Sequence, residues 1–586
     1  MGYYAMDMNG NDNLVPDCKE RFLSNDYADY IVSSSYQGSI RSYFRGECVK
    51  ILDDGLAILS LSRKDTDLMY VITQLYYMVP KCYGLMDTTS MESSGILKSQ
   101  NQPILNLKGR NILVGIIDTG IDYQNPLFRN ADGTTRIKAI WDQTIQTGTP
   151  PETLDYGTEF TADMINQALR SAEPLEVVPS TDTNGHGTFV SGIIAGGEDE
   201  AGGFIGAAPM ADILVVKLKQ AKQYLKDFYF IDSDEVFQET DVMMALYYLR
   251  RRALKWNQPI SIYIGVGTNS GDHIGQGALN QYMNRVNTVA GELISVPAGN
   301  EGNARHHFSG IVRAEQAYDT VELNVGANES GFVMELWGRA PNTYAIGIES
   351  PYGEIIGQVP PRFQNRQRYV FLLERTVVEV SYVLVEELSG MELIFIRVEE
   401  PTEGIWRFRV YATGSTENKY NIWLPIREFV SENTYFLQPD PEITLTEPAT
   451  AEGPICSTAY NHLTDSLYFE ASRGYTGDGE IKPDLAAPGV NVYGPDINRN
   501  PDQTYGFTRR SGTSIAAAHT AGAAALLMEW IESRSNINRM SGIQMKRYLI
   551  RGADRQPELS YPNPSWGYGT LNLFGTFEGL RQRDTI

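Results

Sequence analysis

Continuous runs of apolar residues alternate along much of the chain with longer stretches of helical pattern. The runs lie at residues 111–118, 213–218, 260–266 and 293–296, and stretches such as residues 239–254 separate them. An apolar run without alternation indicates a strand that is covered on both faces, which is the setting of a parallel sheet. Strands that alternate with helices therefore predict an α/β layered domain with a parallel sheet.

A different pattern occupies residues 309–439. Short segments there alternate apolar and polar positions, among them residues 332–337, 391–398 and 405–410, and Gly, Pro and Asn turns separate them. Many short strands with no helical stretch between them are typical of an antiparallel sandwich or jelly roll. Because the α/β pattern resumes afterwards, we expect an all-β jelly-roll domain inserted into the sheet domain.

The N-terminal part predicts a separate small α+β unit. Residues 57–61 have the pattern of a strand, and residues 65–77 suit a helix. The polar stretch 87–95 is rich in small residues, which predicts an exposed linker that a protease can cut. The expected domains are residues 1–94 for this unit, 95–308 and 440–586 for the two parts of the sheet domain, and 309–439 for the insertion.

Size, composition and charge narrow the classes of function. The chain of 586 residues exceeds what one hydrophobic core usually serves, and its 42% hydrophobic and 21% charged residues are typical of a globular protein. Its 72 acidic and 49 basic residues give a net charge of −23, which would repel nucleic acid and anionic membranes. We expect neither as a partner, although the simpler interpretation is that an acidic surface keeps the protein soluble.

Cysteine usage and the N-terminal sequence bear on the cellular context. The four cysteines are widely spread and form no CxxC pair, so we expect free thiols. The first twenty residues have neither the cationic start nor the apolar run of a signal peptide, and we expect no segment that spans a membrane. The sequence therefore supports neither export by the general route nor membrane insertion.

Residues 511–527, SGTSIAAAHTAGAAALL, predict an unusual helix made almost entirely of small residues, with Ser514 near its start. Unpaired N–H groups and the positive end of the dipole at a helix N-terminus favour negative charge by roughly 0.3–1 kcal/mol, which suits an oxyanion. The simpler interpretation is that Ser514 only caps the helix. A nucleophilic serine needs a base and an orienting acid elsewhere in the chain.

Two residues are candidates for that base and acid. His186 stands in TNGHGTFVSG, where glycines on both sides bare its ring, and this is a poor setting for a purely structural histidine. Asp118 ends an apolar strand, at the edge of the sheet where α/β proteins commonly have their active sites. Asp-Thr-Gly is, however, also a common sequence in turns. By contrast, His519 is expected to pack, and His306 and His307 lack a third ligand at metal-site spacing, so we expect no metal site.

Asp118, His186 and Ser514 follow one another in the order acid, base and nucleophile, which is the order in subtilisin. Their surroundings are VGIIDTGID, NGHGT and SGTSIA, and a fourth block consists of SRG and, a few residues later, IKPDLAAPG. On these four blocks the chain resembles the subtilase family of serine proteases, over about residues 108–308 and 440–575.

The resemblance implies a subtilisin-like α/β catalytic domain that hydrolyses peptide bonds through a triad of Asp118, His186 and Ser514. It also assigns Asn300, in VPAGNEG, to oxyanion binding together with the Ser514 backbone N–H. Loss of one such donor typically costs about 100- to 1000-fold in rate. No cofactor is implied, and no tight calcium site either, since the loop at residues 198–203 lacks the spacing by which many relatives bind calcium.

Two further segments pair with an extended protein substrate in the family, as an added strand. In this chain they consist of Gly265, Val266 and Gly267, and of Pro297, Ala298 and Gly299. Thr446 and Glu447 fall where the family forms the base of its first specificity pocket. Glu447 either favours a basic side chain there or points to solvent, and the sequence leaves both alternatives open.

Subtilases are commonly made with an N-terminal prodomain that assists folding and occupies the active site until it is cut. The unit at residues 1–94 fits that description, which makes the enzyme's own prodomain an expected partner and places the cut between Thr88 and Ser94. The alternative is a permanent N-terminal accessory domain.

A chain without a recognisable signal peptide, with a prodomain and an all-β insertion before the serine block, resembles the Csp-type proteases of clostridial spores. In that subgroup the protease activates the precursor of a cortex-degrading hydrolase at germination, which implies a cytoplasmic or spore-associated location in a bacterium. Two alternatives remain: a general bacterial subtilase, and a pseudoprotease that binds or senses a partner in the same pathway. The intact residues Asp118, His186, Asn300 and Ser514 argue against the pseudoprotease.

Overall fold

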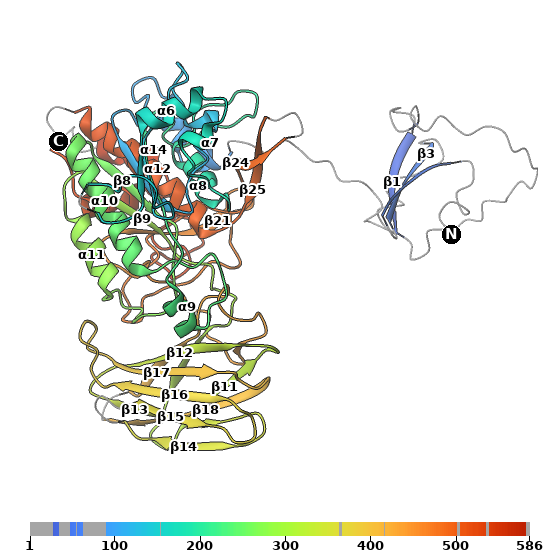
Figure 1. Cartoon of the computed structure of the whole chain (residues 1–586), viewed down its shortest axis with the longest axis vertical. Coiled ribbons are helices and arrows are strands. Elements are labelled where there is room, and N and C mark those ends of the chain that lie inside the picture. The colour runs from blue at the N-terminus through green and yellow to red at the C-terminus, as the bar shows by residue number, and fades with distance from the viewer. Residues whose placement is uncertain are drawn as a thin grey trace, which may run out of the picture. The chain divides into compact units, whose positions relative to one another are not determined.

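The structure is a computed structural model of the chain, and Figure 1 shows it as a cartoon. It describes residues 21, 27–33, 47–53, 56–62, 89–152, 154–361, 366–414, 417–500, 504–534 and 538–581. The chain divides into two compact units, Met1–Met86 and Asp87–Ile586.

The first unit contains a three-stranded antiparallel sheet in the order β1-β3-β2. Its strands are β1 (Tyr27–Ser33), β2 (Cys48–Asp53) and β3 (Leu56–Ser62). The predicted strand at residues 57–61 lies within β3, whereas the predicted helix at residues 65–77 lies outside the described residues. The expectation of free thiols is wrong for Cys48, which is disulfide-bonded, while Cys456 of the second unit is free and buried.

The second unit is built on a nine-stranded sheet in the order β22-β21-β9-β8-β4-β7-β5-β6, with β23 beside β21. Its strands are β4 (Leu113–Asp118), β5 (Ile137–Asp142), β6 (Thr158–Thr161), β7 (Asp212–Lys217), β8 (Ile260–Ile264), β9 (Glu292–Pro297), β21 (Ile455–Asn461), β22 (Ser466–Leu467) and β23 (Leu485–Pro488). Apart from β6 and β22, which pair antiparallel, neighbouring strands run parallel. Every residue of β4 and β8 is buried, as apolar runs without alternation predict. The predicted α/β domain with a parallel sheet is confirmed.

Helices cover both faces of this sheet (Figure 1). The helices of the second unit are α4 (Thr89–Ser93), α5 (Ile96–Asn101), η3 (Pro126–Phe128), α6 (Ala162–Arg170), α7 (Pro174–Val177), α8 (His186–Ala195), α9 (Gln223–Tyr229), α10 (Glu239–Trp256), α11 (Ala278–Asn287), α12 (Thr513–Glu532), α13 (Gly542–Gly552) and α14 (Leu573–Arg581), of which α9 contacts β12 (Gly331–Gly338) of the antiparallel part instead. Val114 and Ile116 of β4 pack in the same cluster as α8 and α12, whereas Leu113 and Ile117 pack with α10 and α11. Alternate residues of a strand thus pack against helices on opposite faces of the sheet.

Helix α12 is the core of one layer. It contacts β8, β9, β21 and α8, and its small residues permit this close approach: a Cβ at Gly522 would lie 2.2 Å from the Ala207 Cβ. Within the described part of the chain it is the one helix long and apolar enough to cross a membrane, but 94% of its apolar window is buried in the protein. Its apolar character is that of a core helix.

Two antiparallel sheets lie between β9 and β21 in the chain, of six strands (β10-β19-β12-β17-β16-β15) and five strands (β14-β13-β18-β11-β20). The strands are β10 (His307–Ile311), β11 (Asp319–Val325), β12 (Gly331–Gly338), β13 (Thr343–Glu349), β14 (Ile355–Val359), β15 (Arg366–Val370), β16 (Val377–Val383), β17 (Glu392–Glu399), β18 (Gly404–Thr413), β19 (Lys419–Trp423) and β20 (Tyr435–Phe436). Apolar side chains from both sheets form one separate core. A two-stranded ribbon, β24 (Val492–Arg499) and β25 (Tyr505–Arg510), precedes α12.

Of the expected exposed linker at residues 87–95, the described part, residues 89–95, is a packed segment instead. Residues Thr89–Ser93 form helix α4, Met91 is 2% exposed and Ser94 is fully buried. The Ser94 hydroxyl donates to the Ser90 carbonyl at 3.0 Å, and the Ser94 carbonyl accepts from Leu573 N at 3.0 Å. Small polar residues suggest exposure in a sequence, but here their hydroxyl groups are satisfied by nearby backbone, so burial costs little. A cut between Thr88 and Ser94 would fall largely inside this packed segment.

Candidate active site

The backbone positions Asp118, His186 and Ser514 at one edge of the sheet. Asp118 is the last residue of β4, His186 is the first of α8, and Ser514 is the second of α12. The glycines around the histidine are required by geometry. Gly185 has a φ of 83°, and a Cβ at Gly187 would lie 2.1 Å from the Gly120 carbonyl oxygen. Only glycine lets the start of α8 approach the loop after β4 so closely.

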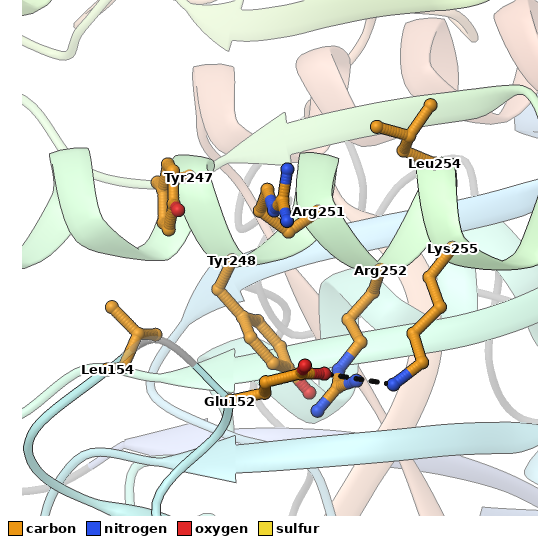
Figure 2. A pocket seen from close by; sticks show the side chains of 8 residues that line it. All are labelled: Glu152, Leu154, Tyr247, Tyr248, Arg251, Arg252, Leu254 and Lys255. Atoms are coloured by element: carbon orange, nitrogen blue, oxygen red, sulfur yellow. Dashed lines mark hydrogen bonds and ion pairs between the residues drawn. The ribbon is translucent and has the colours of Figure 1, made fainter.

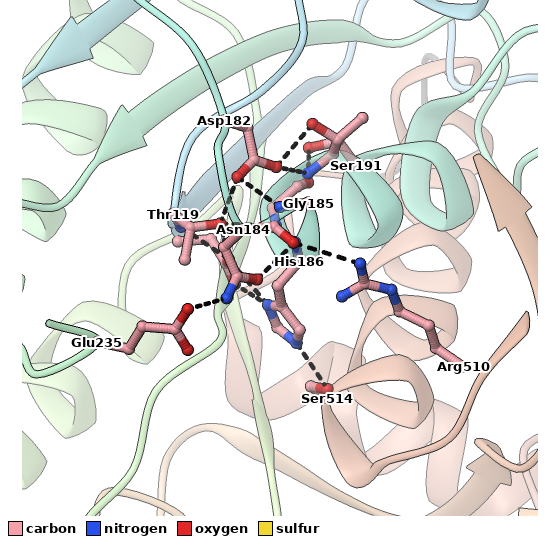
Figure 3. Close-up of polar contacts among 12 residues, drawn as sticks. Thr119, Asp182, Asn184, Gly185, His186, Ser191, Glu235, Arg510 and Ser514 are labelled. Atoms are coloured by element: carbon pink, nitrogen blue, oxygen red, sulfur yellow. Dashed lines mark hydrogen bonds and ion pairs between the residues drawn. The ribbon is translucent and has the colours of Figure 1, made fainter. Parts of the chain in front are cut away.

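The three side chains form a continuous hydrogen-bonded path. His186 Nδ1 lies 2.8 Å from Asp118 Oδ1 and 2.9 Å from Oδ2, and His186 Nε2 lies 3.0 Å from Ser514 Oγ. Figure 3 shows the Ser514 hydroxyl facing the His186 imidazole. With Nδ1–H donating to the carboxylate, Nε2 carries the lone pair that accepts the serine proton. The structure thus brings together the acid, base and hydroxyl that the sequence singled out.

The electrostatic setting favours a proton on His186. Burial alone would lower the pKa of His186, but the charge of Asp118 and its hydrogen bond outweigh that effect and raise the pKa above its usual value of 6.5. Asp118 is 1% exposed and the His186 side chain 27%, so the carboxylate is shielded while the ring remains accessible. An imidazole in this setting suits a general base.

Asp182 is a residue of this site that the sequence analysis missed. Its Oδ1 accepts from the Thr119 hydroxyl at 2.9 Å and from Gly185 N at 2.9 Å, and its Oδ2 accepts from Thr188 N at 2.8 Å (Figure 3). The Thr119 hydroxyl accepts from Gly187 N at 3.0 Å. Asp182 therefore ties the end of β4 to the first turn of α8. A carboxylate just before a helix is a recognisable capping signal that could have revealed it.

Asn300 lies in the loop after β9, beside Ser514. Its Oδ1 accepts from the backbone N–H and the hydroxyl of Thr513, both at 3.1 Å. A Cβ at Gly512 would lie 3.8 Å from Asn300 Nδ2 and 3.3 Å from Ser514 Oγ, so the amide donor and the hydroxyl flank the same space. Because Oδ1 is occupied, the Nδ2 group is the part of Asn300 that remains for a developing oxyanion.

The two segments expected to bind substrate lie beside each other. Gly265, Val266 and Gly267 follow β8, while Pro297, Ala298 and Gly299 end β9 and begin the next loop. A Cβ at Gly267 would lie 2.7 Å from Thr446 Oγ1, and a Cβ at Gly299 would lie 2.6 Å from Thr446 Cγ2. Thr446 is thus wedged between the two segments, as a residue at the base of a shared pocket would be.

Glu447 does not point to solvent, so that alternative is wrong. The residue is 8% exposed, and its Oε2 accepts from Asn280 Nδ2 and the Thr450 hydroxyl. Burial raises the pKa of Glu447, although these two hydrogen bonds lower it in part. Its backbone forms a bridge with Thr268, with Glu447 N donating at 2.7 Å and Thr268 N at 2.9 Å. Whether Glu447 favours a basic side chain stays a prediction.

The remaining histidines have structural partners. His519 is fully buried and its Nδ1 lies 2.9 Å from the Ile515 carbonyl, which confirms the expected packing role. His306 Nδ1 lies 3.1 Å from Glu301 Oε2, and His307 stacks on Trp423 with ring centroids 4.8 Å apart. Among the residues that the structure describes, no group of three or more His, Cys, Asp or Glu side chains is arranged to hold a metal.

A surface pocket lies elsewhere, on the outer side of α10 (Figure 2). It is lined by Glu152, Leu154, Tyr247, Tyr248, Arg251, Arg252, Leu254 and Lys255. Lys255 pairs with Glu152 at 3.0 Å, and Arg252 pairs with Glu159. None of the predicted site residues lines it, so it is not the candidate active site.

Several known proteins are similar to this chain. The model of the subtilase family matches residues 109–569. The solved structure of the Clostridium perfringens CspB protease is similar with a TM-score of 0.74 and 32% identity, over 84% of this chain and 98% of that chain. The minor extracellular protease Vpr of Bacillus subtilis is 30% identical over 98 residues, 17% of this chain and 12% of its own length. The subtilisin-like protease SBT3.6 of Arabidopsis thaliana is 23% identical over 555 residues, which covers 83% of this chain and 64% of its own. The chain thus spans less than two thirds of either curated relative.

Proposed function

The chain belongs to the subtilase family, and on this premise we propose that it is a serine endopeptidase with Ser514 as nucleophile, His186 as general base and Asp118 as the orienting acid. The observation that carries the proposal is the path from Asp118 through His186 to Ser514, with distances of 2.8 Å and 3.0 Å. These lengths permit proton transfer without rearrangement of the site.

The proposed reaction has two halves. Ser514 Oγ attacks the carbonyl carbon of a peptide bond while its proton passes to His186 Nε2, and Asp118 stabilises the imidazolium. The tetrahedral intermediate collapses to an acyl-enzyme as His186 returns that proton to the leaving amine. Water then gives a proton to His186 and attacks the ester carbon, and the proton returns to Ser514 Oγ as the acid product leaves.

In each half of the reaction, negative charge develops on the carbonyl oxygen of the substrate and must be stabilised. We assign its stabilisation to Asn300 Nδ2 and the backbone N–H of Ser514, which lies in the first turn of α12. The fixed Oδ1 of Asn300, held by two donors at 3.1 Å, supports this role because the amide cannot rotate without losing both bonds. Such preorganised donors need no reorientation when charge appears.

An extended protein substrate is the proposed ligand. Gly265–Gly267 and Pro297–Gly299 would each add hydrogen bonds to its backbone, and Thr446 would limit the depth of the first specificity pocket. Glu447 remains a candidate for selecting a basic side chain, because its Oε1 makes no well-formed hydrogen bond to a described residue. Neither cofactor nor metal takes part in this mechanism.

We further propose that the N-terminal unit, expected within residues 1–94, acts as a prodomain that the enzyme removes itself, and that residues 309–439 form an inserted jelly-roll domain. The division of the chain near Met86 supports a separate N-terminal unit. Within the expected range from Thr88 to Ser94, we favour a cut between Thr88 and Thr89, because Ser90, Met91 and Ser94 are buried in the second unit. A permanent accessory domain is the alternative.

The biological setting is proposed from the Csp resemblance. The 32% identity to the Clostridium perfringens CspB protease, over nearly all of that chain, supports a Csp-type enzyme in the cytoplasm or in the spore. Its substrate would then be a protein precursor, such as that of a spore cortex hydrolase. A general bacterial subtilase and a pseudoprotease-like binding partner are the alternatives, and the short path between His186 and Ser514 argues against the second.

The proposal is tested by comparing three proteins: the wild type, Ser514→Ala and Ser511→Ala. Ser511 is an exposed serine just before the same helix and serves as the control. A serine-directed phosphonate should label wild type and Ser511→Ala but not Ser514→Ala. Mass spectrometry should find only Ser514→Ala unprocessed, with the mature chain of the others beginning at Thr89. Unlabelled, folded wild type would favour the binding partner instead.

A further inference from the structure

Tyr263 lies beneath the proposed active site, at a position that no motif marked. It is fully buried on β8, where Ile262 and Ile264 pack with α10 and α11. Tyr263 itself packs in the cluster that contains α8 and α12, because alternate residues of a strand face opposite sides. Its phenol therefore lies on the same side of the sheet as the path from Asp118 to Ser514.

Gly265 shows how closely Tyr263 and Asp118 approach. A Cβ at Gly265 would lie 2.0 Å from Asp118 Oδ2 and 2.9 Å from both the Cε1 and the hydroxyl oxygen of Tyr263. The carboxylate and the phenol therefore border the same small space. Any residue other than glycine at position 265 would be driven into one or the other.

The Tyr263 hydroxyl is buried without a well-formed hydrogen bond to any described residue. A buried donor without a partner destabilises a folded protein, and most such donors in native structures have a reason to exist. Burial and the charge of Asp118 raise the pKa of Tyr263 well above its usual value of 10.0, although the neighbouring Ser514 hydroxyl lowers it in part. The phenol thus keeps its proton and is available as a donor close to Ser514.

Two possible acceptors lie near the Tyr263 hydroxyl, and they differ in the hydrogen bonds that they already accept. Asp118 Oδ1 accepts from Thr119 N at 2.7 Å and from His186 at 2.8 Å, and Oδ2 also faces His186, at 2.9 Å. Ser514 Oγ donates to His186 and has no donor of its own among the described residues. As its proton leaves, Ser514 Oγ gains the negative charge that a phenol donor stabilises.

We propose that Tyr263 takes part in the reaction as a hydrogen-bond donor to Ser514 Oγ. In the resting enzyme the contact is loose, and it tightens when the serine proton passes to His186, while the phenol keeps its own proton. The loose contact leaves Ser514 free to donate to His186, and the tightened one stabilises the oxygen that attacks. This inference rests on the proposed function of the same site.

The test compares Tyr263→Phe with Tyr248→Phe in the full chain. Tyr248 is also buried, but it lies on α10, on the other side of the sheet, and its hydroxyl donates to Glu159 at 2.7 Å. Tyr263→Phe should lower kcat for p-nitrophenyl acetate, and the rate of phosphonate labelling, by about tenfold, which is the effect of one hydrogen bond. KM and the acid limb of the pH profile should stay unchanged, and Tm should stay the same or rise because an unpaired donor is removed.

Tyr248→Phe should show the reverse, a lower Tm with unchanged kcat. A Tyr263→Phe variant that keeps wild-type kcat and labelling rate would overturn the inference. A shift in the acid limb of the pH profile of Tyr263→Phe would also overturn the inference. It would show that the phenol hydrogen-bonds to Asp118 and affects the rate through the pKa of His186. If the wild type itself is not labelled, the proposed function fails; if the wild type is labelled and Tyr263→Phe is labelled equally fast, only the role of Tyr263 fails.

Discussion

Thr513 holds the amide of Asn300 in one orientation. The backbone N–H and the hydroxyl of Thr513 both donate to Asn300 Oδ1 at 3.1 Å, and the same hydroxyl accepts from Gly299 N at 3.1 Å. Thr513, the residue next to Ser514, therefore fixes both the proposed oxyanion donor and the end of a proposed substrate segment. Positioning of this kind is what makes a single donor effective, because its orientation is set before charge develops.

Asn300→Ala should lower kcat by about 100- to 1000-fold and leave KM nearly unchanged, since the donor acts on charge that exists only in the transition state. Steady-state kinetics on a peptide substrate measure both. The control is Asn303→Ala in the same loop, whose Oδ1 accepts from Arg427 at 2.6 Å. A rise in KM with unchanged kcat would assign Asn300 to substrate binding rather than to the oxyanion.

The activity should depend on pH through His186. Only the neutral ring accepts the serine proton, and its pKa lies above 6.5, so kcat/KM should rise with pH through a midpoint above that value. Asp118→Asn should lower kcat by about 10,000-fold and move the midpoint to lower pH, because burial then acts unopposed. A pH profile of the wild type, Asp118→Asn and the exposed control Asp132→Asn checks this. An Asp118→Asn profile with the wild-type midpoint would contradict it.

Stability should fall as the pH rises from 4.5 to about 7, because of Glu335 in β12. Burial raises the pKa of Glu335 from an ordinary 4.5 to about 7, with Asp272 and Glu447 adding to the rise, while hydrogen bonds from Gly271 N and Trp337 Nε1 lower it in part. The folded protein thus binds more protons than the unfolded chain between these two pH values, and its free energy of unfolding decreases across them by roughly 3 kcal/mol at most.

Urea unfolding of the wild type and Glu335→Gln at pH 5, 6 and 8 measures this dependence. Glutamine does not titrate, so the variant should lose the part of the slope that Glu335 contributes. Equal slopes for the two proteins would show that Glu335 titrates normally.

Gly522→Ala should destabilise the second unit by about 1–3 kcal/mol, because the added Cβ would lie 2.2 Å from the Ala207 Cβ and force the helix out of place. Gly357→Ala is the control, since no atom lies within 4 Å of a Cβ there, and its effect should stay within about 0.5 kcal/mol. Thermal unfolding measures both. Equal Tm values would mean that α12 can shift at no cost.

The sequence by itself determined the parallel sheet, the all-β insertion and the residue types of the site. Apolar runs without alternation mark strands that are covered on both faces, and β4 and β8 are buried throughout. The motifs around Asp118, His186 and Ser514, which carry the proposed chemistry, are short and local, so they could be recognised without knowing which residues meet.

Only the tertiary structure decided which groups face one another. His186 and Ser514 are 328 positions apart, and their 3.0 Å separation depends on how α8 and α12 pack on the sheet. The same packing buries Ser90 and Ser94 of the segment expected to be exposed, buries Glu447, for which the sequence left exposure open, and places Tyr263 in the layer of α8 and α12. An apolar run shows that a strand is buried but not which layer each side chain enters, because that choice is fixed by contacts between distant segments.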